Sequence, residues 1–404
     1  MSAVLERINA FNKGRLPQMI ARKMDAMRSN VFSFYRGTCH LFAEDYASGF
    51  KFKDKSLIWT CGDLHFENFG TYKDLERKVY FDINDFDEAA LAPLSFDLIR
   101  LITSFYVAGS QFKLAEKKIS LLAYDLYDSY VKIVQKGKPL NGYRAIRSGM
   151  IEQLINSVKI RKEEALLKKY LQTGKTPLLK IVEGHTRAVD KKTVDDLKIR
   201  IDKWAKKKQL PYTALDVAFR IAGTGSLGVN HYMVLAQNSA AKKLELLDIK
   251  EAMPSSLVPF LSIKQPKAKN EAVRIIQAQK AIQFMPPKIL KTMNFSKAWY
   301  YVKLLQPFQD KIDITQPLSK LKMLEGAAVD MGEILASGQL RTCGFNGSVS
   351  VKKFQQQVLK NEDFKKAVLD YAAEYSKKVS RDYSAFCSAL KKQSPLPTGK
   401  KKAK

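Results

Sequence analysis

Two short polar segments, each adjoining an apolar stretch, constrain the possible folds of this chain more than any other feature. The first reads CGDLHFENFG at 61–70 and follows SLIWT; the second reads FDINDFDEAA at 81–90 and continues the alternating pattern of KVYFDI. Both patterns predict strands, so two strands deliver polar clusters to their ends. Residues 41–100 hold twelve Asp and Glu against seven Lys and Arg, although the chain has a formal net charge of +29. We therefore expect these acidic residues to be placed for a purpose.

Length and composition predict a folded protein with a sizeable core. The 404 residues, 46% of them hydrophobic, suit two or three packed subdomains. No apolar run of about 18 residues and no signal-type apolar region is present, so we expect a cytoplasmic protein without a membrane span. The cysteines are dispersed without a CxxC pair, which argues against a disulfide framework and against a zinc site.

The pattern along the chain predicts a largely helical α+β protein. Helical periodicity covers 20–50 and about 95–210, and helices return at about 271–283 and over 317–387. Residues 216–252 read as three strands joined by a Gly-rich turn and a polar turn. The chain then divides into a part with the acidic segments at 1–210, a β-rich part at 211–290, a helical completion at 291–388, and a basic disordered tail at 389–404.

The residue types in the acidic segments suit phosphoryl transfer. This reaction needs an Asp near the acceptor hydroxyl, with an Asn and a second Asp that hold Mg²⁺ on the phosphates. GDLHFEN supplies Asp63 and Asn68, and DINDFDEA supplies Asp85 seventeen residues after Asn68. Turn chemistry alone is the alternative interpretation, because Asp, Asn and Gly are also the commonest turn residues.

Several neighbouring residues allow two interpretations. Asp82 and Asp87 flank Asp85 and either share metal binding or serve as exposed or capping residues. Arg36 either reaches the site or forms an ordinary salt bridge. We expect structural roles for the remaining histidines and a place in the core for three aromatic residues: His40, His185 and His231, and Trp299, Tyr300 and Tyr301.

A Gly-rich stretch, GTGSLG, gives an independent indication of nucleotide binding. By itself it is a weak match to GxGxxG, but the alternating VNHYMVLA that follows predicts a strand, whereas a dinucleotide site needs a helix there. A β-hairpin turn of this kind could cover phosphates through Gly223, Gly225, Ser226 and Gly228. The next strand, LELLDIKEA, places Lys250 where it could pair with phosphates, and the helix after it offers Glu271 as its carboxylate partner.

The acidic segments resemble the aminoglycoside and choline kinase-like branch of the kinase-like superfamily, whose loops read HGDLHxxN and IDFxxA. CGDLHFENFG differs by Cys61 in place of the leading His. The resemblance implies that Asp63 is the catalytic base and His65 a loop-stabilising residue, that Asn68 and Asp85 bind Mg²⁺, and that Asp97 in SFDLIR braces the catalytic loop.

A second resemblance extends over most of residues 20–385. FSFYRGTCHLFAEDY, CGDLHFENFG, FDINDFDEA, GTGSLGVNHYMVL and IKEA occur in this order and are similar to the bacterial family called domain of unknown function 2252. This family implies motif positions and a kinase-like fold but no agreed substrate. In ordinary kinases the Gly-rich hairpin precedes the catalytic loop, whereas here it follows by about 160 residues. Either the two-lobed kinase-like fold is circularly permuted, which we favour, or one motif is accidental.

These patterns favour an ATP- and Mg²⁺-dependent phosphotransferase that acts on a small-molecule hydroxyl. A nucleotidyl (AMP) transferase on the same fold is one alternative, because reversing the nucleotide needs no new residue types. A basic protein that binds nucleic acid is another, suggested by KIRKEEALLKKYLQTGK, although its lysines alternate with acidic residues. The third is a nucleotide-binding protein without activity, which the complete set of Asp63, Asn68, Asp85 and Lys250 argues against.

Overall fold

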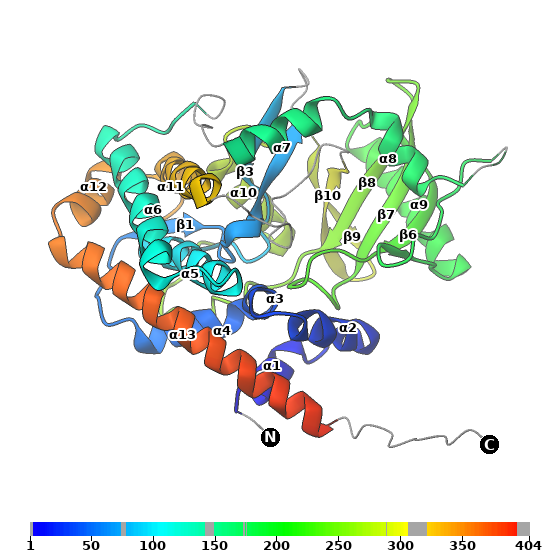
Figure 1. Ribbon diagram of the computed structural model, residues 1–404. Helices are drawn as coiled ribbons and strands as arrows, with labels where there is room; N and C mark the ends of the chain where they lie inside the picture. Colours follow the sequence, from blue (N-terminus) through cyan, green and yellow to red (C-terminus); the bar gives the residue numbers. More distant parts are fainter. Residues whose placement is uncertain are drawn as a thin grey trace, which may run out of the picture.

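The computed structural model describes residues 3–73, 78–141, 149–172, 174, 176–287, 289–305 and 321–393. A six-stranded sheet forms one part of the molecule, and helices with two short ladders form the other (Figure 1). Helices hold 52% and strands 17% of the chain, which confirms a largely helical protein of mixed helix and sheet. None of the helices in these residues is both long and apolar enough to span a membrane.

The six-stranded sheet contains the Gly-rich turn and the strand of Lys250. Its order is β5-β6-β7-β8-β10-β9, and all neighbours are antiparallel. The bounds are β5 Thr186–Arg187, β6 Tyr212–Arg220, β7 His231–Asn238, β8 Lys243–Glu251, β9 Leu290–Phe295 and β10 Ala298–Leu304. The three strands predicted over 216–252 are therefore confirmed as β6, β7 and β8.

Helices cover both faces of this sheet. On one face, α9 (Lys191–Lys207) packs Leu197 and Ile201 against apolar residues of β6, β7 and β8. On the other, α8 (Glu163–Tyr170) packs Tyr170 against β6, β7 and β8, and α10 (Glu271–Ile282) contacts β9 and β10. The side chain of Asn270 caps α10 by accepting the backbone N–H of Val273, as its position before a Glu-initiated helix favours.

The two short ladders position both acidic segments. Strand β1 (Leu57–Thr60) pairs with β4 (Ala90–Pro93), and β2 (Phe69–Lys73) pairs with β3 (Val79–Ile83). The segment 61–68 links β1 to β2, and 84–89 links β3 to β4. Thr60 lies opposite Ala90 in one ladder, and Phe69 lies opposite Ile83 in the other. The two segments therefore start and end at paired residues, so they face each other.

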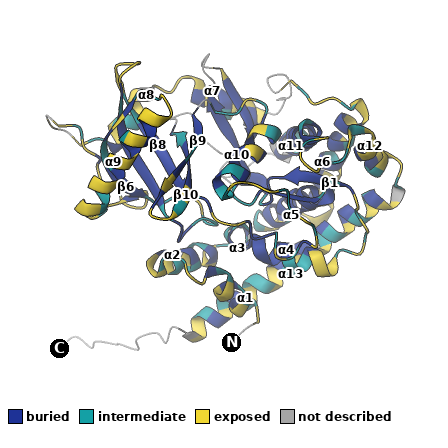
Figure 2. Ribbon diagram, turned by 180° about the vertical axis from the view of Figure 1, so that it is seen from behind, coloured by how far each residue is buried: buried dark blue, intermediate teal, exposed yellow. Residues whose placement is uncertain are grey.

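The buried helix α5 (Ser95–Gln111) forms the centre of the helical part. It contacts α3, α6 and α13, and most of its side chains are buried on every side (Figure 2). The other helices are α1 Ala3–Asn12, α2 Pro17–Arg28, α3 Val31–Gly37, α4 Cys39–Gly49, α6 Glu116–Lys136, α7 Gly149–Lys159, α11 Leu321–Thr342, α12 Val351–Leu359 and α13 Glu362–Gln393, with a 3₁₀ turn, η1, at Phe66–Asn68.

The structure corrects two expectations about local elements. The single helical stretch over 20–50 is divided into α2, α3 and α4, because Asn30 has an extended backbone and caps α3 through Ser33. Tyr300 and Tyr301 are buried as expected, but Trp299, near the start of β10, is 40% exposed.

The two ends of the described chain lie close together. Helix α1 contacts α13, and Figure 1 shows the start of the chain beside the end of α13. Residues 389–393 belong to α13, which ends at Gln393, so the first five residues of the predicted disordered tail are helical. The remainder of the tail, 394–404, lies outside the described residues.

Candidate active site

A cavity of about 60 Å³ lies where the two acidic segments meet the Gly-rich turn and the end of β8. Seven of the ten predicted site residues line it: Asp63, His65, Asp85, Gly223, Gly225, Ser226 and Lys250. Asn68, Gly228 and Glu271 are not among its lining residues. Small-molecule sites usually enclose about 300–1,000 Å³, so this cavity is smaller than a typical site of that kind.

The backbone at the start of the first acidic segment is held by a single buried carboxylate. Asp97 on α5 accepts the N–H of Cys61 at 2.8 Å and that of Gly62 at 3.1 Å. Burial raises the pKa of Asp97 to about 6, against the opposing effect of these hydrogen bonds. Gly62 has a φ of +86°, and a Cβ there would stand 2.2 Å from the carbonyl oxygen of Glu88. The tight approach of the two acidic segments therefore requires glycine at this position.

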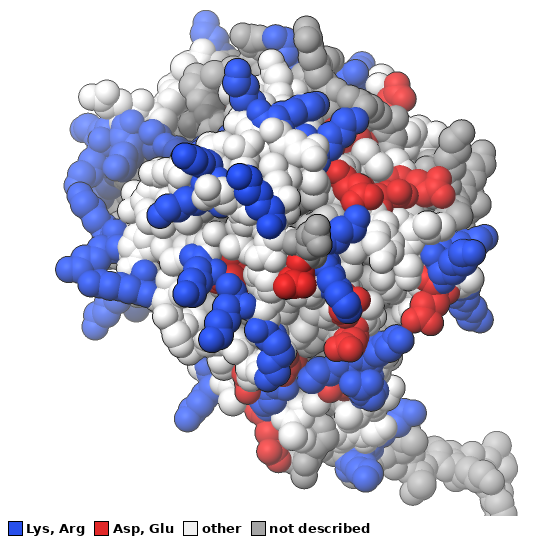
Figure 3. All heavy atoms as spheres, turned by 90° about the vertical axis from the view of Figure 1, so that its left-hand side faces the viewer, with Lys and Arg blue, Asp and Glu red and all other residues white. Residues whose placement is uncertain are grey.

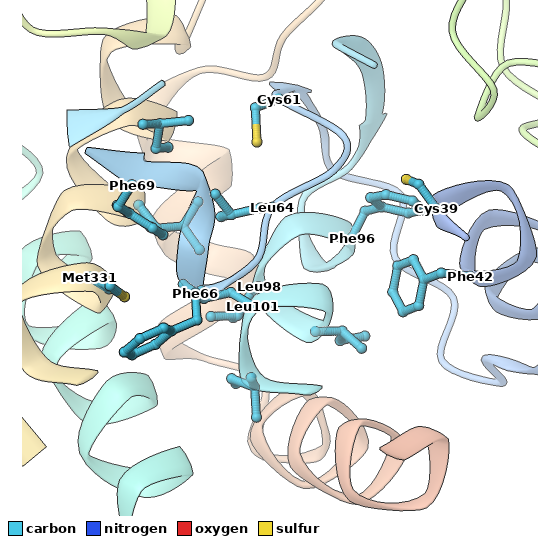
Figure 4. Packing of buried hydrophobic residues seen from close by; sticks show 14 of the residues in the cluster. Cys39, Phe42, Cys61, Leu64, Phe66, Phe69, Phe96, Leu98, Leu101 and Met331 are labelled. Carbon is cyan, nitrogen blue, oxygen red and sulfur yellow. The ribbon is translucent and has the colours of Figure 1, made fainter. Parts of the chain in front are cut away.

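Apolar side chains anchor the same segment from below. Leu64 and Phe66 turn into the core, where Figure 4 shows them beside Leu98 and Leu101 of α5. Polar Asp63 and His65 line the cavity instead, because apolar and polar positions alternate in CGDLHFEN. The packing of the core thus fixes the direction of the polar side chains.

Asp63, the predicted base, forms an ion pair with the fully buried Arg100. The Nε of Arg100 donates to Oδ1 of Asp63 at 2.9 Å, and its Nη2 contacts the same oxygen. Arg100 is itself held between the rings of Tyr35 and Phe42 and donates to the carbonyl oxygen of Tyr35 at 3.2 Å. Oδ1 is therefore occupied, and Oδ2 is left toward the Gly-rich turn, where a Cβ on Gly225 would stand 3.7 Å from it.

Asn68 and His65, the other two predicted residues of the first acidic segment, make contacts within it and to the second acidic segment. Asn68 donates from Nδ2 to the carbonyl oxygen of Asp63 at 2.9 Å, and its own carbonyl oxygen accepts the N–H of Asn84 at 3.0 Å. His65 is buried, lies edge-on to Phe32 and accepts the N–H of Asn68 at its carbonyl oxygen. These contacts connect the loop to its neighbours, and the loop-stabilising role of the His65 side chain stays a prediction.

Lys250 enters the cavity from β8 and pairs with Asp87 of the second segment. Its Nζ forms an ion pair with Oδ2 of Asp87 and donates to Oγ of Ser226 at 2.6 Å. Tyr301 donates to Oδ1 of Asp87 at 2.8 Å. Asp85, two residues earlier, lines the same cavity and is exposed. Asp87 therefore connects the Gly-rich turn, the sheet and the acidic segment.

The electrostatics of this cluster assign different protonation behaviour to its members. Burial opposes the charge of Asp87 and Lys250, but their ion pair lowers the pKa of Asp87 and raises the pKa of Lys250. Desolvation and the charge of Asp87 raise the pKa of Asp85, although the residue keeps part of its surface exposed. The ion pair thus stabilises the charged forms of Lys250 and Asp87, while a cation beside Asp85 would offset the charge of its carboxylate.

Glu271 pairs with a residue of its own helix. Its carboxylate accepts from Nε of Arg274 at 2.5 Å, and Arg274 also donates to the carbonyl oxygens of Asp87 and Met253, each at 2.9 Å. No ion pair joins Glu271 to Lys250 among the described residues. Helix α10 therefore reaches the site through an arginine that holds the backbone of the second segment.

The residues present suit a divalent cation that arrives with phosphates. Mg²⁺ in such sites is held by one or two carboxylates together with waters and substrate phosphates, so no closed cage is needed. The exposed carboxylate of Asp85 meets this requirement, and Asn68 lies next to it through the contact of its Nδ2 with the carbonyl oxygen of Asp85 at 3.5 Å. No group of three or more His, Cys, Asp and Glu side chains in the described part of the chain is arranged to hold a metal ion.

Sequence reasoning missed three basic residues at this site. Arg100 follows Asp97 by three positions on α5, so helical spacing offered a signal that both face the same loop. Arg15 and Lys23 offered no such signal, because their contacts with the Gly-rich turn join residues about 200 positions apart. Arg36 lines the cavity and pairs with Glu67 at 2.5 Å, so it reaches the site and forms a salt bridge.

The fold and this cavity define a protein of mixed helix and sheet with a Gly-rich turn set over paired carboxylates. A sequence model of the family described as "Uncharacterized protein conserved in bacteria (DUF2252)" matches residues 15–389, and the chain belongs to this family. Comparison with curated proteins and comparison with solved structures gave no match. The family membership predicted from the sequence is confirmed, and the kinase-like relationship stays a prediction.

Proposed function

We propose that this protein transfers a phosphoryl group from ATP, with Mg²⁺, to a hydroxyl group of a small molecule. One observation carries the proposal: Asp63, Asp85 and Lys250 come from three separate segments and line one cavity beneath the Gly-rich turn. Phosphoryl transfer needs these three groups in one place, because the protein contributes by positioning and by offsetting charge.

Each residue has a defined task in this reaction. Asp63 accepts the proton of the acceptor hydroxyl through Oδ2, since Arg100 occupies Oδ1. Lys250 exchanges Asp87 for the donor phosphates, and the Gly-rich turn opens to admit them. Asp85 and Asn68 would hold the metal ion. Mg²⁺, when bound, offsets the negative charge of the phosphates during transfer.

The strand order supports a kinase-like lobe in permuted form. In kinases the phosphate-pairing Lys lies on the third strand, after the Gly-rich hairpin and before a helix. Here β6 and β7 flank the Gly-rich turn, β8 carries Lys250, and α10 precedes β9 and β10. The contact between α1 and α13 brings the two ends of the described chain together, as circular permutation requires.

Two alternatives use the same surface differently. A nucleotidyl transferase would bind the nucleotide in the opposite direction with the same residues. For nucleic acid, Figure 3 shows a face on which Lys and Arg outnumber Asp and Glu, with acidic groups among the basic ones. A continuous basic surface would favour nucleic acid, so we prefer the small-molecule reaction, which we place in the cytoplasm.

The experiment that tests the proposal incubates the protein with Mg²⁺ and a bacterial metabolite extract. ATP carries its label either on the γ-phosphate or on the α-phosphate, and Asp63→Asn serves as the matched inactive variant. Transfer of the γ label to a small molecule by the wild type alone is the expected result. Transfer of the α label would indicate a nucleotidyl transferase, and transfer of neither label would reject both enzymatic functions.

A further inference from the structure

Two cations from the first helices of the chain reach the Gly-rich turn. Arg15, between α1 and α2, lines the cavity and donates from Nη1 to the carbonyl oxygens of Gly225 at 2.8 Å and Leu227 at 3.2 Å. Lys23, on α2, donates from Nζ to the carbonyl oxygen of Gly225 at 3.3 Å and to Oδ1 of Asn12 at 3.2 Å. The loop motifs and Lys250 already provide the groups of the proposed reaction, so these two cations need a separate explanation.

Lys23 is a buried amine without an anionic partner. Its side chain is fully buried, and no carboxylate lies within ion-pair distance of Lys23 or Arg15 in the described part of the chain. Burial and the neighbouring Arg15 lower the pKa of Lys23 well below its ordinary value, which favours the uncharged amine. An anion bound beside Lys23 favours its charged form and supplies the missing counterion.

We propose that Arg15 and Lys23 bind an anionic group of the acceptor, which makes the acceptor an alcohol that also carries a phosphate or carboxylate. The inference rests on the proposed function and specifies its substrate class. Both side chains donate to the carbonyl oxygen of Gly225, which carries no net charge. An anionic oxygen is the better partner, because it also supplies a counterion for the buried basic groups.

The position of their shared partner assigns the pair to the acceptor and not to the donor. Arg15 and Lys23 both donate to the carbonyl oxygen of Gly225, and a Cβ on Gly225 would stand 3.7 Å from Oδ2 of Asp63, the proposed base. Lys250 instead contacts Asp87, in the segment that would hold the metal ion. The donor phosphates lie on the metal side in phosphoryl transfer and the acceptor lies beside the base. The two sets of cations therefore serve the two substrates separately.

Calorimetry with inorganic phosphate tests this assignment on the full chain. Phosphate represents the anionic group and is titrated into the protein with Mg²⁺ and a saturating non-hydrolysable ATP analogue. The variants are Arg15→Gln and Lys23→Met, with Lys23→Arg as the charge-preserving variant and the exposed Lys13→Met as control. Thermal unfolding measured for each variant shows that it is folded.

We expect wild-type protein and Lys13→Met to bind one phosphate alongside the analogue. Arg15→Gln and Lys23→Met should each weaken phosphate binding roughly ten- to a hundredfold, the loss of a charged hydrogen bond, with unchanged affinity for the analogue. Lys23→Arg should recover most of the phosphate affinity.

Three results would separate the possible failures. Displacement of phosphate by the analogue would place both cations in the donor site and overturn the acceptor assignment. Equal phosphate affinity in all folded variants would overturn the anion site itself. Weaker phosphate binding in Arg15→Gln and Lys23→Met, without any binding of the analogue, would support the anion site and reject the phosphotransferase function.

Discussion

Lys250 on β8 pairs with Asp87, which stands two residues after Asp85 and belongs to the segment between β3 and β4. The phosphate-pairing lysine of the proposal thus takes its carboxylate from the segment that would hold the metal ion. A nucleotide that binds here replaces Asp87 at Lys250, which leaves a second carboxylate beside Asp85. The ion pair with Asp87 and the binding of nucleotide phosphates are therefore competing uses of Lys250.

Removal of Lys250 should destabilise the fold through the carboxylate left behind. Asp87 keeps a quarter or less of its side chain exposed, so Lys250→Met should lower the free energy of unfolding by about 2–3 kcal/mol, somewhat less than for a fully buried pair. The double variant with Asp87→Asn should recover most of this loss. Urea unfolding of the four proteins measures the coupling, and losses that simply add would show that the pair contributes nothing.

Asp63 and Lys250 should differ in their effects on nucleotide affinity. Asp63→Ala removes the group that accepts the proton and also the carboxylate partner of the buried Arg100, so thermal unfolding must show that the variant is folded. In the folded variant, turnover should fall about 10²–10⁴-fold with little change in the dissociation constant of the ATP analogue. Lys250→Ala should weaken both, because this cation acts before and during transfer. If both variants lose nucleotide affinity equally, Asp63 belongs to the binding site and is not the base.

The free energy of unfolding should depend on pH through the titration of Asp97. Burial raises its pKa in the folded state to about 6, against about 3.9 for an unfolded chain. Between these values the folded state binds more protons, so this contribution to stability is largest below about pH 4 and falls as pH rises to about 6. The difference in unfolding free energy between wild type and Asp97→Asn, measured in urea, should fall over this range. A difference that rises with pH would contradict the assignment.

Gly62 should tolerate no side chain, whereas Gly14 tolerates one at the cost of backbone strain alone. Both have a φ near +85°, but a Cβ at Gly14 has no atom within 4 Å and one at Gly62 meets the carbonyl of Glu88. Gly14→Ala should therefore cost about 1–2 kcal/mol of stability. Gly62→Ala should cost roughly 1–3 kcal/mol more, the penalty of overpacking. Equal losses in thermal unfolding would show that the two acidic segments are not held at this distance.

Local patterns predicted the elements whose signals lie within a few residues. The strands over 216–252 and the helix from Glu271 were readable because alternation and capping act over short distances. Strands β9 and β10 were missed, since their two-residue turn, Ser296 and Lys297, has positive φ at both positions without the usual Asn or Gly.

The sequence predicted those site residues whose positions follow from the strands beside them. Asp63 and Asp85 follow strands and Lys250 lies at the end of β8, and strand pairing brings the ends of strands together. The counterion of Lys250 was not readable, because α10 presents Arg274 to the second acidic segment and Asp87 reaches Lys250 from 163 residues away. Contacts at that separation depend on how the parts of the chain pack, which a local pattern does not encode.

Binding of a non-hydrolysable ATP analogue with and without Mg²⁺ tests the central claim most directly. Calorimetry compares the wild type with Asp85→Asn and with Asp370→Asn, which changes an exposed carboxylate on α13. We predict that Mg²⁺ strengthens binding of the analogue to the wild type and to Asp370→Asn, and that Asp85→Asn stays folded but loses this gain, because a hard cation requires the charged oxygen ligand. An Mg²⁺-dependent gain retained in full by Asp85→Asn, or absent from the wild type, would contradict the account.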